Sequence, residues 1–246
     1  MSTLIAALQA NLTRVRERIA AAARAGGRDP SAIALVAVSK TFGAAHVLAA
    51  AKLGVRAFGE NYVQEALLKI AQMRQAAPEL SCQWHLIGPL QSNKTRAAAQ
   101  TFDWVQTVDR LKIAERLSAQ RPPHLPPLNV LIQVNISGEA SKSGVTPAEV
   151  ASLAHAVAAL PRLQLRGLMA IPAPAAEAGA RRAPFARLRA LFEDLRAQGL
   201  PLDTLSMGMS EDLEEAIAEG ATMVRVGTAI FGARAADTSP PLAADR

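Results

Sequence analysis

The stretch of sequence that decides the fold runs from Asn129 to Ala170. It opens with Asn129-Val-Leu-Ile-Gln-Val134, an apolar run typical of a buried strand. Thr146-Pro147-Ala148-Glu149 follows as a capping box with proline at the first helical position, and it begins a helix with one apolar face. Leu163 to Ala170 is a second apolar run. A strand, a helix and another strand in this order predict a parallel pair joined by a helical crossover.

The same alternation continues on both sides of this unit. The expected strands are short apolar runs at residues 34–39, 55–58, 83–87, 104–108, 129–134, 163–170, 204–206 and 222–226. Helical segments lie between them, and a leading helix is expected over residues 1–25. Eight alternations predict an α/β protein with a single (β/α)₈ TIM barrel over residues 1–234, followed by a disordered tail at 235–246. An open doubly wound sheet is the alternative, but no G-x-G-x-x-G motif follows the first strand.

The charge balance bears on the class of partner. The chain has 27 basic and 21 acidic residues, a net charge of +6 and a pI of about 10.1. A pI this high favours a nucleic-acid partner, but the basic residues are scattered along the chain. One Tyr, two Trp and six Phe supply few side chains for base stacking. We therefore expect an arginine-rich solvated surface and no nucleic-acid partner, with a nucleic-acid-associated barrel as a remote alternative.

Composition also argues against metal and membrane roles. The single cysteine, Cys82, excludes a disulfide framework and a cysteine-based zinc site within one chain. The four histidines lack metal-ligand spacing, so no metal is expected. The longest strongly apolar stretch, Val150 to Leu160, is shorter than the roughly 20 residues that a membrane span needs. The N-terminus lacks the pattern of a signal peptide, so we expect a cytoplasmic protein without a membrane partner.

In a (β/α)₈ barrel the functional site lies at the carboxyl ends of the strands. Lys40 ends the first expected strand, and Glu60-Asn61 follow the second. We expect the stem of Lys40 to be desolvated, which favours the neutral amine that forms a Schiff base. The alternative is a lysine that only carries its charge to solvent at a strand end. Asn61 is expected either to hydrogen-bond a ligand or to shape its turn.

Two turns near the chain's end indicate a phosphate site. Ser206-Met-Gly-Met-Ser210 and Gly227-Thr228 follow the last two expected strands, where barrels often bind phosphate through backbone N–H groups. Ordinary helix capping by Ser210 is the alternative. We expect Glu211 and Asp212 to point outward, because carboxylates facing the site would repel a phosphate.

Two further polar residues lie within expected strands. Arg225 alternates with Val224 and Val226, so an inward guanidinium would need an anion or another acceptor. A structural ion pair is the alternative. His85 is expected to be a core residue with its hydrogen bonds satisfied.

Six segments are more specific together than any one alone: Ala37-Val-Ser-Lys-Thr41, Phe58-Gly-Glu-Asn-Tyr-Val-Gln-Glu65, Trp84-His-Leu-Ile-Gly-Pro-Leu-Gln-Ser-Asn-Lys94, Gly167-Leu-Met-Ala-Ile-Pro172, Leu205-Ser-Met-Gly-Met-Ser210 and Val224-Arg-Val-Gly-Thr-Ala-Ile-Phe-Gly232. Together they resemble the pyridoxal phosphate homeostasis protein family, in the family's order, over residues 34–234. Leu86 stands where many members carry phenylalanine, a conservative apolar change. The resemblance implies a fold-type III barrel like the N-terminal domain of alanine racemase.

The resemblance also implies a cofactor and a role for each site residue. The cofactor is pyridoxal 5′-phosphate (PLP), which Lys40 would hold as a covalent Schiff base. Arg225 matches the arginine that faces the pyridine nitrogen, and Asn61 matches a residue lining the cofactor pocket. Lys142 matches a second lysine suspected of a part in cofactor transfer. The phosphate cradle is matched by Ser206, Ser210, Gly227 and Thr228, with backbone groups of Met209 nearby.

Arg225 also bears on whether the protein is an enzyme. A guanidinium always donates, so the ring nitrogen opposite it stays neutral and the ring is a weak electron sink. Racemases of this fold also use an arginine, but they add a tyrosine and a second β-domain. Here the single tyrosine, Tyr62, follows the second strand, and the chain after the eighth strand is too short for such a domain.

We therefore expect a non-catalytic PLP-binding protein. It would store or shield the cofactor, or deliver it to apo-enzymes that depend on PLP, and it is expected to be a monomer. A small PLP-dependent enzyme, such as an amino-acid racemase, is the alternative. The Pro-rich and Ala-rich segment at residues 172–184 is expected to be a long loop that closes over the site.

Overall fold

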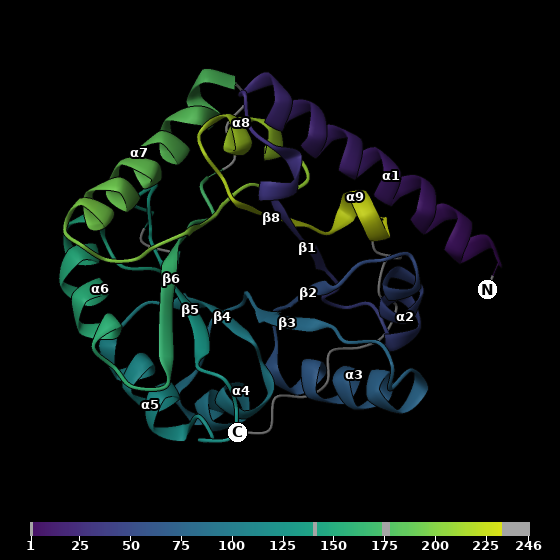
Figure 1. Ribbon diagram of the computed structural model, residues 1–246, viewed down its shortest axis with the longest axis horizontal. Helices are drawn as coiled ribbons and strands as arrows, with labels where there is room; N and C mark the ends of the chain where they lie inside the picture. Colours follow the sequence, from purple (N-terminus) through teal and green to yellow (C-terminus); the bar gives the residue numbers. More distant parts are fainter. Residues whose placement is uncertain (1, 140–141, 174–177, 233–246) are drawn as a thin grey trace.

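The structure of the protein is a computed structural model that describes residues 2–139, 142–173 and 178–232. Its strands form a closed parallel barrel in the order β1 to β8. Helices form a ring around the barrel (Figure 1). Closure depends on the pairing of β8 with β1, from Ala34↔Met223 to Ala37↔Val226. This pairing confirms the predicted (β/α)₈ barrel and excludes the open sheet.

The strands are short, and their side chains alternate between the barrel interior and the helical layer. They are β1 (Ala34–Val38), β2 (Ala57–Glu60), β3 (Gln83–Leu86), β4 (Trp104–Val108), β5 (Leu128–Gln133), β6 (Leu163–Met169), β7 (Thr204–Ser206) and β8 (Met223–Val226). Because both faces of these parallel strands are covered, their sequences are nearly continuous apolar runs rather than an apolar–polar alternation.

The helices follow the strands as predicted. They are α1 (Ser2–Ala25), α2 (Ala44–Lys52), α3 (Val63–Ala76), α4 (Thr95–Thr101), α5 (Leu111–Gln120), α6 (Val150–Ala158), α7 (Ala178–Ala197), α8 (Leu213–Ala218) and α9 (Thr228–Phe231), with 3₁₀ turns η1 (Pro30–Ala32), η2 (Ser92–Lys94) and η3 (Pro147–Glu149). The capping box is present: Thr146 donates its N–H at 2.9 Å and its hydroxyl at 2.7 Å to Glu149. It opens η3, which continues into α6.

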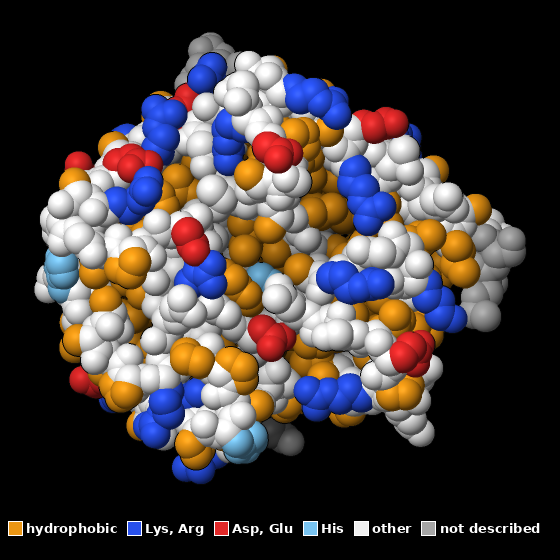
Figure 2. Space-filling view, in the orientation of Figure 1, with side chains coloured by type: hydrophobic (Ala, Val, Ile, Leu, Met, Phe, Trp, Pro, Cys, Tyr) orange, Lys and Arg blue, Asp and Glu red, His pale blue; other side chains and the backbone are white. Residues whose placement is uncertain are grey.

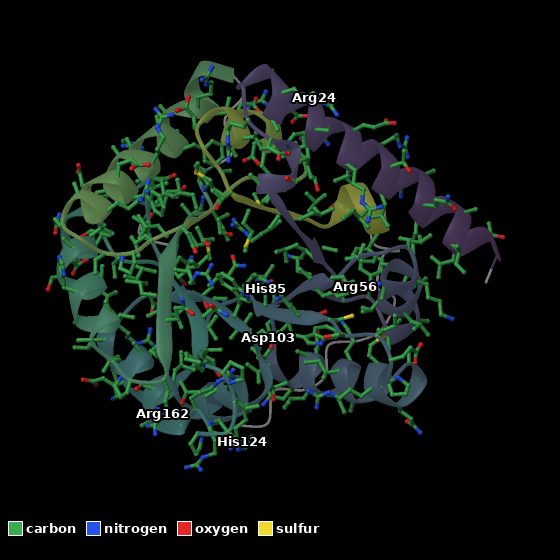
Figure 3. The ribbon with its side chains drawn as sticks, viewed as in Figure 1. Arg24, Arg56, His85, Asp103, His124 and Arg162 are labelled. Atoms are coloured by element: carbon green, nitrogen blue, oxygen red, sulfur yellow. The ribbon has the colours of Figure 1, made fainter. Side chains whose placement is uncertain are left out.

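The hydrophobic core has two parts. The larger part lies between the strands and the surrounding helices. A smaller cluster lies inside the barrel and consists of Val36, Trp104, Leu131, Met169 and Met223. Polar side chains from neighbouring strand positions lie in the barrel as well, and His85 is seen among them inside the ring of strands (Figure 3).

The leading helix α1 completes the outer layer. It packs against α8, α9 and α2, where the last and first barrel elements meet (Figure 1). Leu8, Leu12 and Val15 are buried on its inner face, and Arg18 donates two hydrogen bonds, at 2.6 and 2.8 Å, to Glu214 of α8. α1 therefore covers the closure of the barrel, where α9 has only four residues.

Two predicted boundaries are wrong. The second strand was expected at residues 55–58, but β2 is Ala57–Glu60. Val55 donates its N–H to Ala50 and closes the turn after α2, so pairing with β3 begins only at Ala57. Glu60 is consequently a buried strand residue rather than part of the loop.

The segment 172–184 is not one long loop. α7 begins at Ala178 and includes Pro184, which lacks the N–H that would bond to the preceding turn. The alanines and arginines around it are strong helix formers, and this local preference outweighs the loss of one hydrogen bond. Residues 174–177, on which the expected closure depends, lie outside the described residues. The predicted tail at 235–246 also lies outside them.

On the face seen in the space-filling view, basic side chains are interspersed with acidic ones around the rim (Figure 2). No continuous basic stripe of the kind that tracks a nucleic-acid backbone is visible on this face. None of the described helices is both long and apolar enough to cross a bilayer.

Candidate functional site

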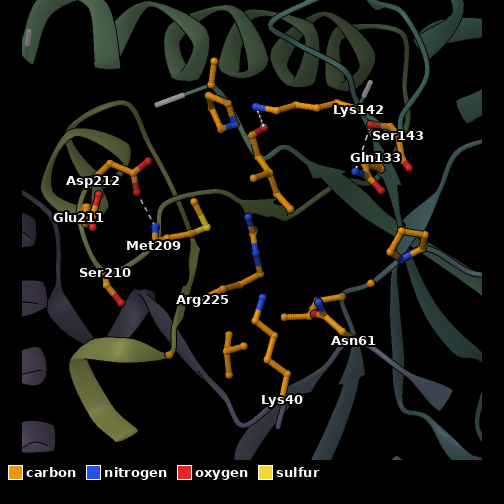
Figure 4. A pocket seen from close by; sticks show the side chains of 18 of the residues that line it. Lys40, Asn61, Gln133, Lys142, Ser143, Met209, Ser210, Glu211, Asp212 and Arg225 are labelled. Atoms are coloured by element: carbon orange, nitrogen blue, oxygen red, sulfur yellow. Dashed lines mark hydrogen bonds between the residues drawn. The ribbon is translucent and has the colours of Figure 1, made fainter. Parts of the chain in front are cut away.

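A cavity of about 670 Å³ opens at the carboxyl ends of the strands. Among the described residues, those that line the cavity lie at or after the carboxyl end of every strand except β4. The volume is in the usual range for small-molecule sites. It brings together most of the residues that the sequence predicted for the site, namely Lys40, Asn61, Lys142, Met209, Ser210, Arg225, Gly227 and Thr228 (Figure 4). Ser206 is the exception.

Lys40 follows β1 and extends into the cavity beside Arg225 (Figure 4). Its side chain is exposed, so the desolvated position expected from the sequence is not found. The cause is local, because β1 ends at Val38 and the backbone then turns away from the apolar wall through Thr41, whose φ is 69°. The Lys40 amine is therefore accessible to a molecule in the cavity.

Ser39, the residue before Lys40, belongs to a buried polar cluster that sequence reasoning missed. Lys69 of α3 places its Nζ 2.5 Å from Glu60 Oε1 and 2.8 Å from the Ser39 carbonyl oxygen. The Ser39 hydroxyl donates to the same Glu60 oxygen at 2.6 Å. Burial raises the pKa of Glu60, and the hydrogen bond from Lys69 acts in the opposite direction. The cluster ties the peptide before Lys40 to α3.

A signal for this cluster was present in the sequence. Lys69 lies on the buried stripe of α3, between Ala66 and Met73. A lysine at such a position must find an acceptor. A carboxylate at the end of the preceding strand was available at Glu60.

The turns after β7 and β8 meet at one side of the cavity. Ser210 accepts a hydrogen bond from the N–H of Ala229 at 3.3 Å. Ser210 therefore caps α9, whose own N-cap, Gly227, has no side chain, rather than the helix that follows it in sequence. The backbone N–H groups of Gly227 and Thr228 donate to no acceptor within the described residues. These two residues of the cavity wall thus leave two backbone donors available to a ligand.

The acidic residues after β7 are not placed as expected. Glu211 and Asp212 both lie in the cavity wall instead of pointing outward. Asp212 Oδ1 accepts the N–H of Met209 at 2.6 Å across the turn before α8. The Met209 N–H, expected in the phosphate cradle, is therefore already engaged.

Arg225 is the buried cation of the site. It is 3 % exposed, its Nη1 donates to Ser206 Oγ at 2.6 Å and its Nη2 donates to the Ala170 carbonyl at 2.9 Å. No carboxylate of the described residues lies within 4.0 Å of it, so the predicted alternative of a structural ion pair is not found. Burial lowers the pKa of Arg225 to about 10, opposed by the charge of Asp212. It remains charged at neutral pH.

Ser206 does not reach the cavity wall. It is fully buried at the end of β7, and its hydroxyl donates to Gln106 Oε1 at 2.6 Å while it accepts from Arg225. The prediction that Ser206 contacts a phosphate is therefore corrected. As the third residue of β7 it points into the barrel, one level below the turn that carries Ser210. Gln106 was not predicted, although a glutamine between Val105 and Val108 in a strand is the signal that reveals it.

Asn61 lies in the cavity wall at the start of the turn after β2. Gly88 makes this placement possible, because a Cβ on Gly88 would lie only 2.2 Å from the Asn61 carbonyl oxygen. The Gly88 carbonyl accepts the hydroxyl of Thr107 at 2.9 Å, which holds the turn in place. Asn61 therefore both shapes the turn and faces the cavity, so the two roles left open by the sequence are compatible.

Lys142 lies across the cavity from Lys40 (Figure 4). Its Nζ is 2.9 Å from Glu139 Oε1 and 3.5 Å from the Ile171 carbonyl. Asn135 organises the loop that carries it, because the Asn135 amide donates to the Glu139 carbonyl at 2.8 Å. Lys142 is thus held at the rim by a partly exposed ion pair.

Tyr62 is 58 % exposed and lies outside the cavity wall. Cys82 is half-buried and packs against the core. Within the described residues, no group of three His, Cys, Asp or Glu side chains is arranged to hold a metal ion. The site therefore offers an accessible amine, a buried cation without an anionic partner, and two free N–H groups. These groups fit an anionic ligand that carries an aldehyde.

Comparison with known proteins agrees with this chemistry. A model of the "Alanine racemase, N-terminal domain" family matches residues 5–235. The pyridoxal phosphate homeostasis protein of Pseudomonas aeruginosa is 61% identical over 224 residues, which covers 91% of this chain and 94% of the relative. The protein of the same name in Escherichia coli K12 is 57% identical over 225 residues, or 91% of this chain and 95% of the relative. This chain belongs to the pyridoxal phosphate homeostasis protein family.

Solved structures place the family in its fold. PipY of Synechococcus elongatus, solved with PLP bound, has 36% sequence identity and a TM-score of 0.79, and the match covers 92% of this chain and all (100%) of PipY. Alanine racemase of Clostridium difficile has a TM-score of 0.70 at 16% identity, and the match covers 94% of this chain but 58% of the racemase. The racemase likeness is one of fold alone.

Proposed function

We propose that this protein binds PLP through a covalent bond to Lys40 and takes part in intracellular PLP homeostasis without robust catalytic activity of its own. One observation carries the proposal: the Lys40 amine, the buried Arg225 and the free N–H groups of Gly227 and Thr228 line one cavity. The names of the curated relatives and the PLP-bound structure of PipY support the choice of cofactor.

Each group of the site has a separate task in this proposal. When bound, PLP supplies an aldehyde that condenses reversibly with an amine, forming a C=N bond and releasing one water. Lys40 presents that amine from an exposed position. The N–H groups of Gly227 and Thr228 would hold the phosphate group, and Arg225 would donate to the ring nitrogen. Asn61 borders the ring.

The composition of the cavity wall supports a holding role rather than turnover. Its described residues include no tyrosine, histidine or cysteine that would act as a second base opposite Lys40. Lys142 is paired with Glu139 at the rim. Arg225 keeps its proton, so it leaves the ring nitrogen unprotonated and the ring a weak electron sink. An amino-acid racemase is the second candidate, and these features count against it.

A holding role accounts for the open cavity. The accessible amine allows PLP to enter and leave, which storage, shielding and delivery all need. We infer that apo-enzymes dependent on PLP are the recipients, that Lys142 assists the transfer from the rim, and that the protein acts as a cytoplasmic monomer.

The purified protein should show the visible absorbance band of lysine-bound PLP, and borohydride should fix the cofactor to the peptide that contains Lys40. Lys40→Ala should abolish both signals. Lys52→Ala, at an exposed position of α2, is the matched control and should keep them. A protein that binds no PLP, or that is labelled on another lysine alone, would contradict the proposal.

Incubation with L-amino acids in deuterated water separates the two candidate functions. The holding role predicts no sustained exchange of the α-proton, because the cavity wall lacks a second base. Exchange with continuous turnover, lost in Lys40→Ala, would overturn the non-catalytic part of the proposal and favour a racemase.

A further inference from the structure

A chain of buried hydrogen bonds runs across the barrel beneath the cavity. It starts at Arg225 of β8, whose Nη1 is 2.6 Å from Ser206 Oγ in β7. Ser206 Oγ is 2.6 Å from Gln106 Oε1 in β4. Gln106 Nε2 is 2.9 Å from Nδ1 of His85 in β3. All four side chains are at most 3 % exposed.

The chemistry of Arg225 and the orientation of the Gln106 amide together set the direction of every bond in this chain. A guanidinium has no acceptor, so Ser206 must accept from it. The Ser206 hydrogen then goes to Gln106, which receives it on its carbonyl oxygen. The Gln106 amide is left to face His85 with its NH₂ group. His85 Nδ1 must therefore be an acceptor, and its ring proton must lie on Nε2.

The surroundings of His85 favour this neutral form. Its ring stacks on Trp104, with the ring centroids 5.3 Å apart and the planes at 9°. Burial lowers the pKa of His85 to about 3. Its Nε2 is buried without a hydrogen-bond partner in the described part of the chain. A protonated His85 would place an N–H against the Gln106 NH₂ group and reverse the chain.

We propose that Ser206, Gln106 and His85 are positioning residues that hold the Arg225 guanidinium in one orientation, as a fixed donor at the floor of the cavity. The inference rests on the proposed function, because the group that Arg225 serves is the ring nitrogen of bound PLP. The hydrogen-bond partners of Arg225 in the described structure are neutral, so no ion pair within the protein neutralises its charge. The chain through β7, β4 and β3 holds its Nη1 side, and the Ala170 carbonyl after β6 accepts from its Nη2.

The direction of the chain can be tested without PLP. In protein with ¹⁵N-labelled histidine, NMR should find the proton of His85 on Nε2 at neutral pH. An ionised glutamate side chain only accepts hydrogen bonds. In Gln106→Glu the group facing His85 Nδ1 is therefore an acceptor, and the ring proton of His85 should move onto Nδ1. Ser118→Ala, which removes a buried hydroxyl that donates to the Pro161 carbonyl outside the cavity wall, is the control and should leave His85 unchanged. A wild-type His85 with its proton on Nδ1 would overturn the proposed chain.

The positioning role is tested with PLP labelled with ¹⁵N at the ring. Ser206→Ala and Gln106→Leu should each shift the ring ¹⁵N signal and weaken PLP affinity about tenfold, which is typical for loss of a hydrogen bond to a charged group. Both variants should still be fixed to PLP by borohydride, because Lys40 is untouched. Ser118→Ala should cause no ring shift.

The outcomes separate this inference from the proposed function. If Ser206→Ala and Gln106→Leu bind PLP with the wild-type ring signal, the positioning role is wrong and PLP binding stands. If the wild-type protein binds no PLP, the proposed function is wrong, and the His85 spectra still decide the direction of the chain. Where Ser206→Ala does not fold, Gln106→Leu still tests the role, and an unshifted ring signal in it counts against the role.

Discussion

Lys69 and Arg225 are both buried cations at the carboxyl end of the barrel, but their charges are used differently. Lys69 is 6 % exposed and contacts a carboxylate, Glu60, at 2.5 Å. Arg225 is 3 % exposed and contacts only a hydroxyl and a carbonyl oxygen. The first charge is compensated within the protein. The second is hydrogen-bonded but has no anionic partner in the described structure.

This difference separates a structural cation from a functional one. A buried ion pair contributes little net stability compared with apolar packing, yet breaking it is costly. A buried cation whose partners are all neutral can still attract an anionic ligand that enters the cavity, because no carboxylate has neutralised its charge. Lys69 therefore supports the backbone beside Lys40, whereas Arg225 takes part in binding. The predictions below test that division through stability and PLP binding, starting with the largest expected change.

Lys69→Met should lower the free energy of unfolding by about 3–5 kcal/mol, because it leaves Glu60 buried without its cation. The deficit should shrink at acid pH, where Glu60 takes up a proton and no longer needs a partner. Denaturant titrations of PLP-free protein at several pH values measure both effects. Lys52→Met, at an exposed position, is the control. A loss below about 1 kcal/mol would mean that the buried pair is not structural.

Arg225→Met should show the opposite pattern. Without PLP it should lose only about 1–3 kcal/mol, less than Lys69→Met, because it leaves a neutral hydroxyl and a carbonyl without their donor rather than a buried charge without its partner. PLP at 100 times its Kd should stabilise the wild type by about 2.7 kcal/mol, and much of this gain should be lost in the variant. Thermal or denaturant unfolding with and without PLP measures it. If Arg225→Met were unfolded in the absence of PLP, Arg225 would be a structural cation like Lys69.

His85 adds a pH dependence to the Arg225 side of the comparison. Its pKa is lowered to about 3 in the folded protein, against an ordinary value of 6.5. As the pH falls below 6.5, His85 binds a proton in the unfolded chain but stays neutral in the folded protein. The free energy of unfolding therefore falls by up to about 1.4 kcal/mol per pH unit. His85→Gln should flatten the stability curve between pH 6.5 and 3. Parallel curves for the two proteins would contradict the neutral His85.

The partly exposed ion pair between Arg18 and Glu214 should give the smallest change in stability of the variants compared. The hydrogen bond from Arg18 lowers the pKa of Glu214, so its contribution is present at neutral pH and is lost as the pH falls through the lowered pKa. Because both side chains are partly exposed, Glu214→Gln should cost at most about 1 kcal/mol at pH 7. Denaturant titration at pH 7 and pH 3 measures it, with Glu17→Gln as the control. A loss as large as that of Lys69→Met would remove the distinction between buried and exposed pairs.

Much of the fold was predictable because it depends on local pattern. The order of strands and helices follows from apolar runs and helix caps, which are formed by residues close together in the sequence. The four residues of the capping box, 146–149, were enough to predict the helical segment of η3 and α6. The errors occurred where local pattern was ambiguous. Val55 is apolar but closes a turn, and Pro184 is tolerated inside α7.

The site was predictable in part, for a different reason. The sequence located one site residue, Arg225, within the last strand. The others follow strands, whose ends meet at one edge of a barrel: Lys40, Asn61, Lys142, Ser210, Gly227 and Thr228. The sequence could not assign the hydrogen bonds among them. Ser206 was expected at the phosphate, but the inward direction of β7 gives its hydroxyl to Arg225 and Gln106.

By itself, the sequence determined the alternation of strands and helices, the family and the residues at the strand ends, because these depend on spacing along the chain. Only the tertiary structure decided which buried polar groups meet. Closure of the barrel brings β8 beside β1, and its interior brings β3, β4, β7 and β8 into one hydrogen-bonded chain. The physical reason is that a buried polar group must find its hydrogen-bond partner beside it in space, and such partners can lie far apart in the sequence, as Gln106 and Ser206 do at 100 positions.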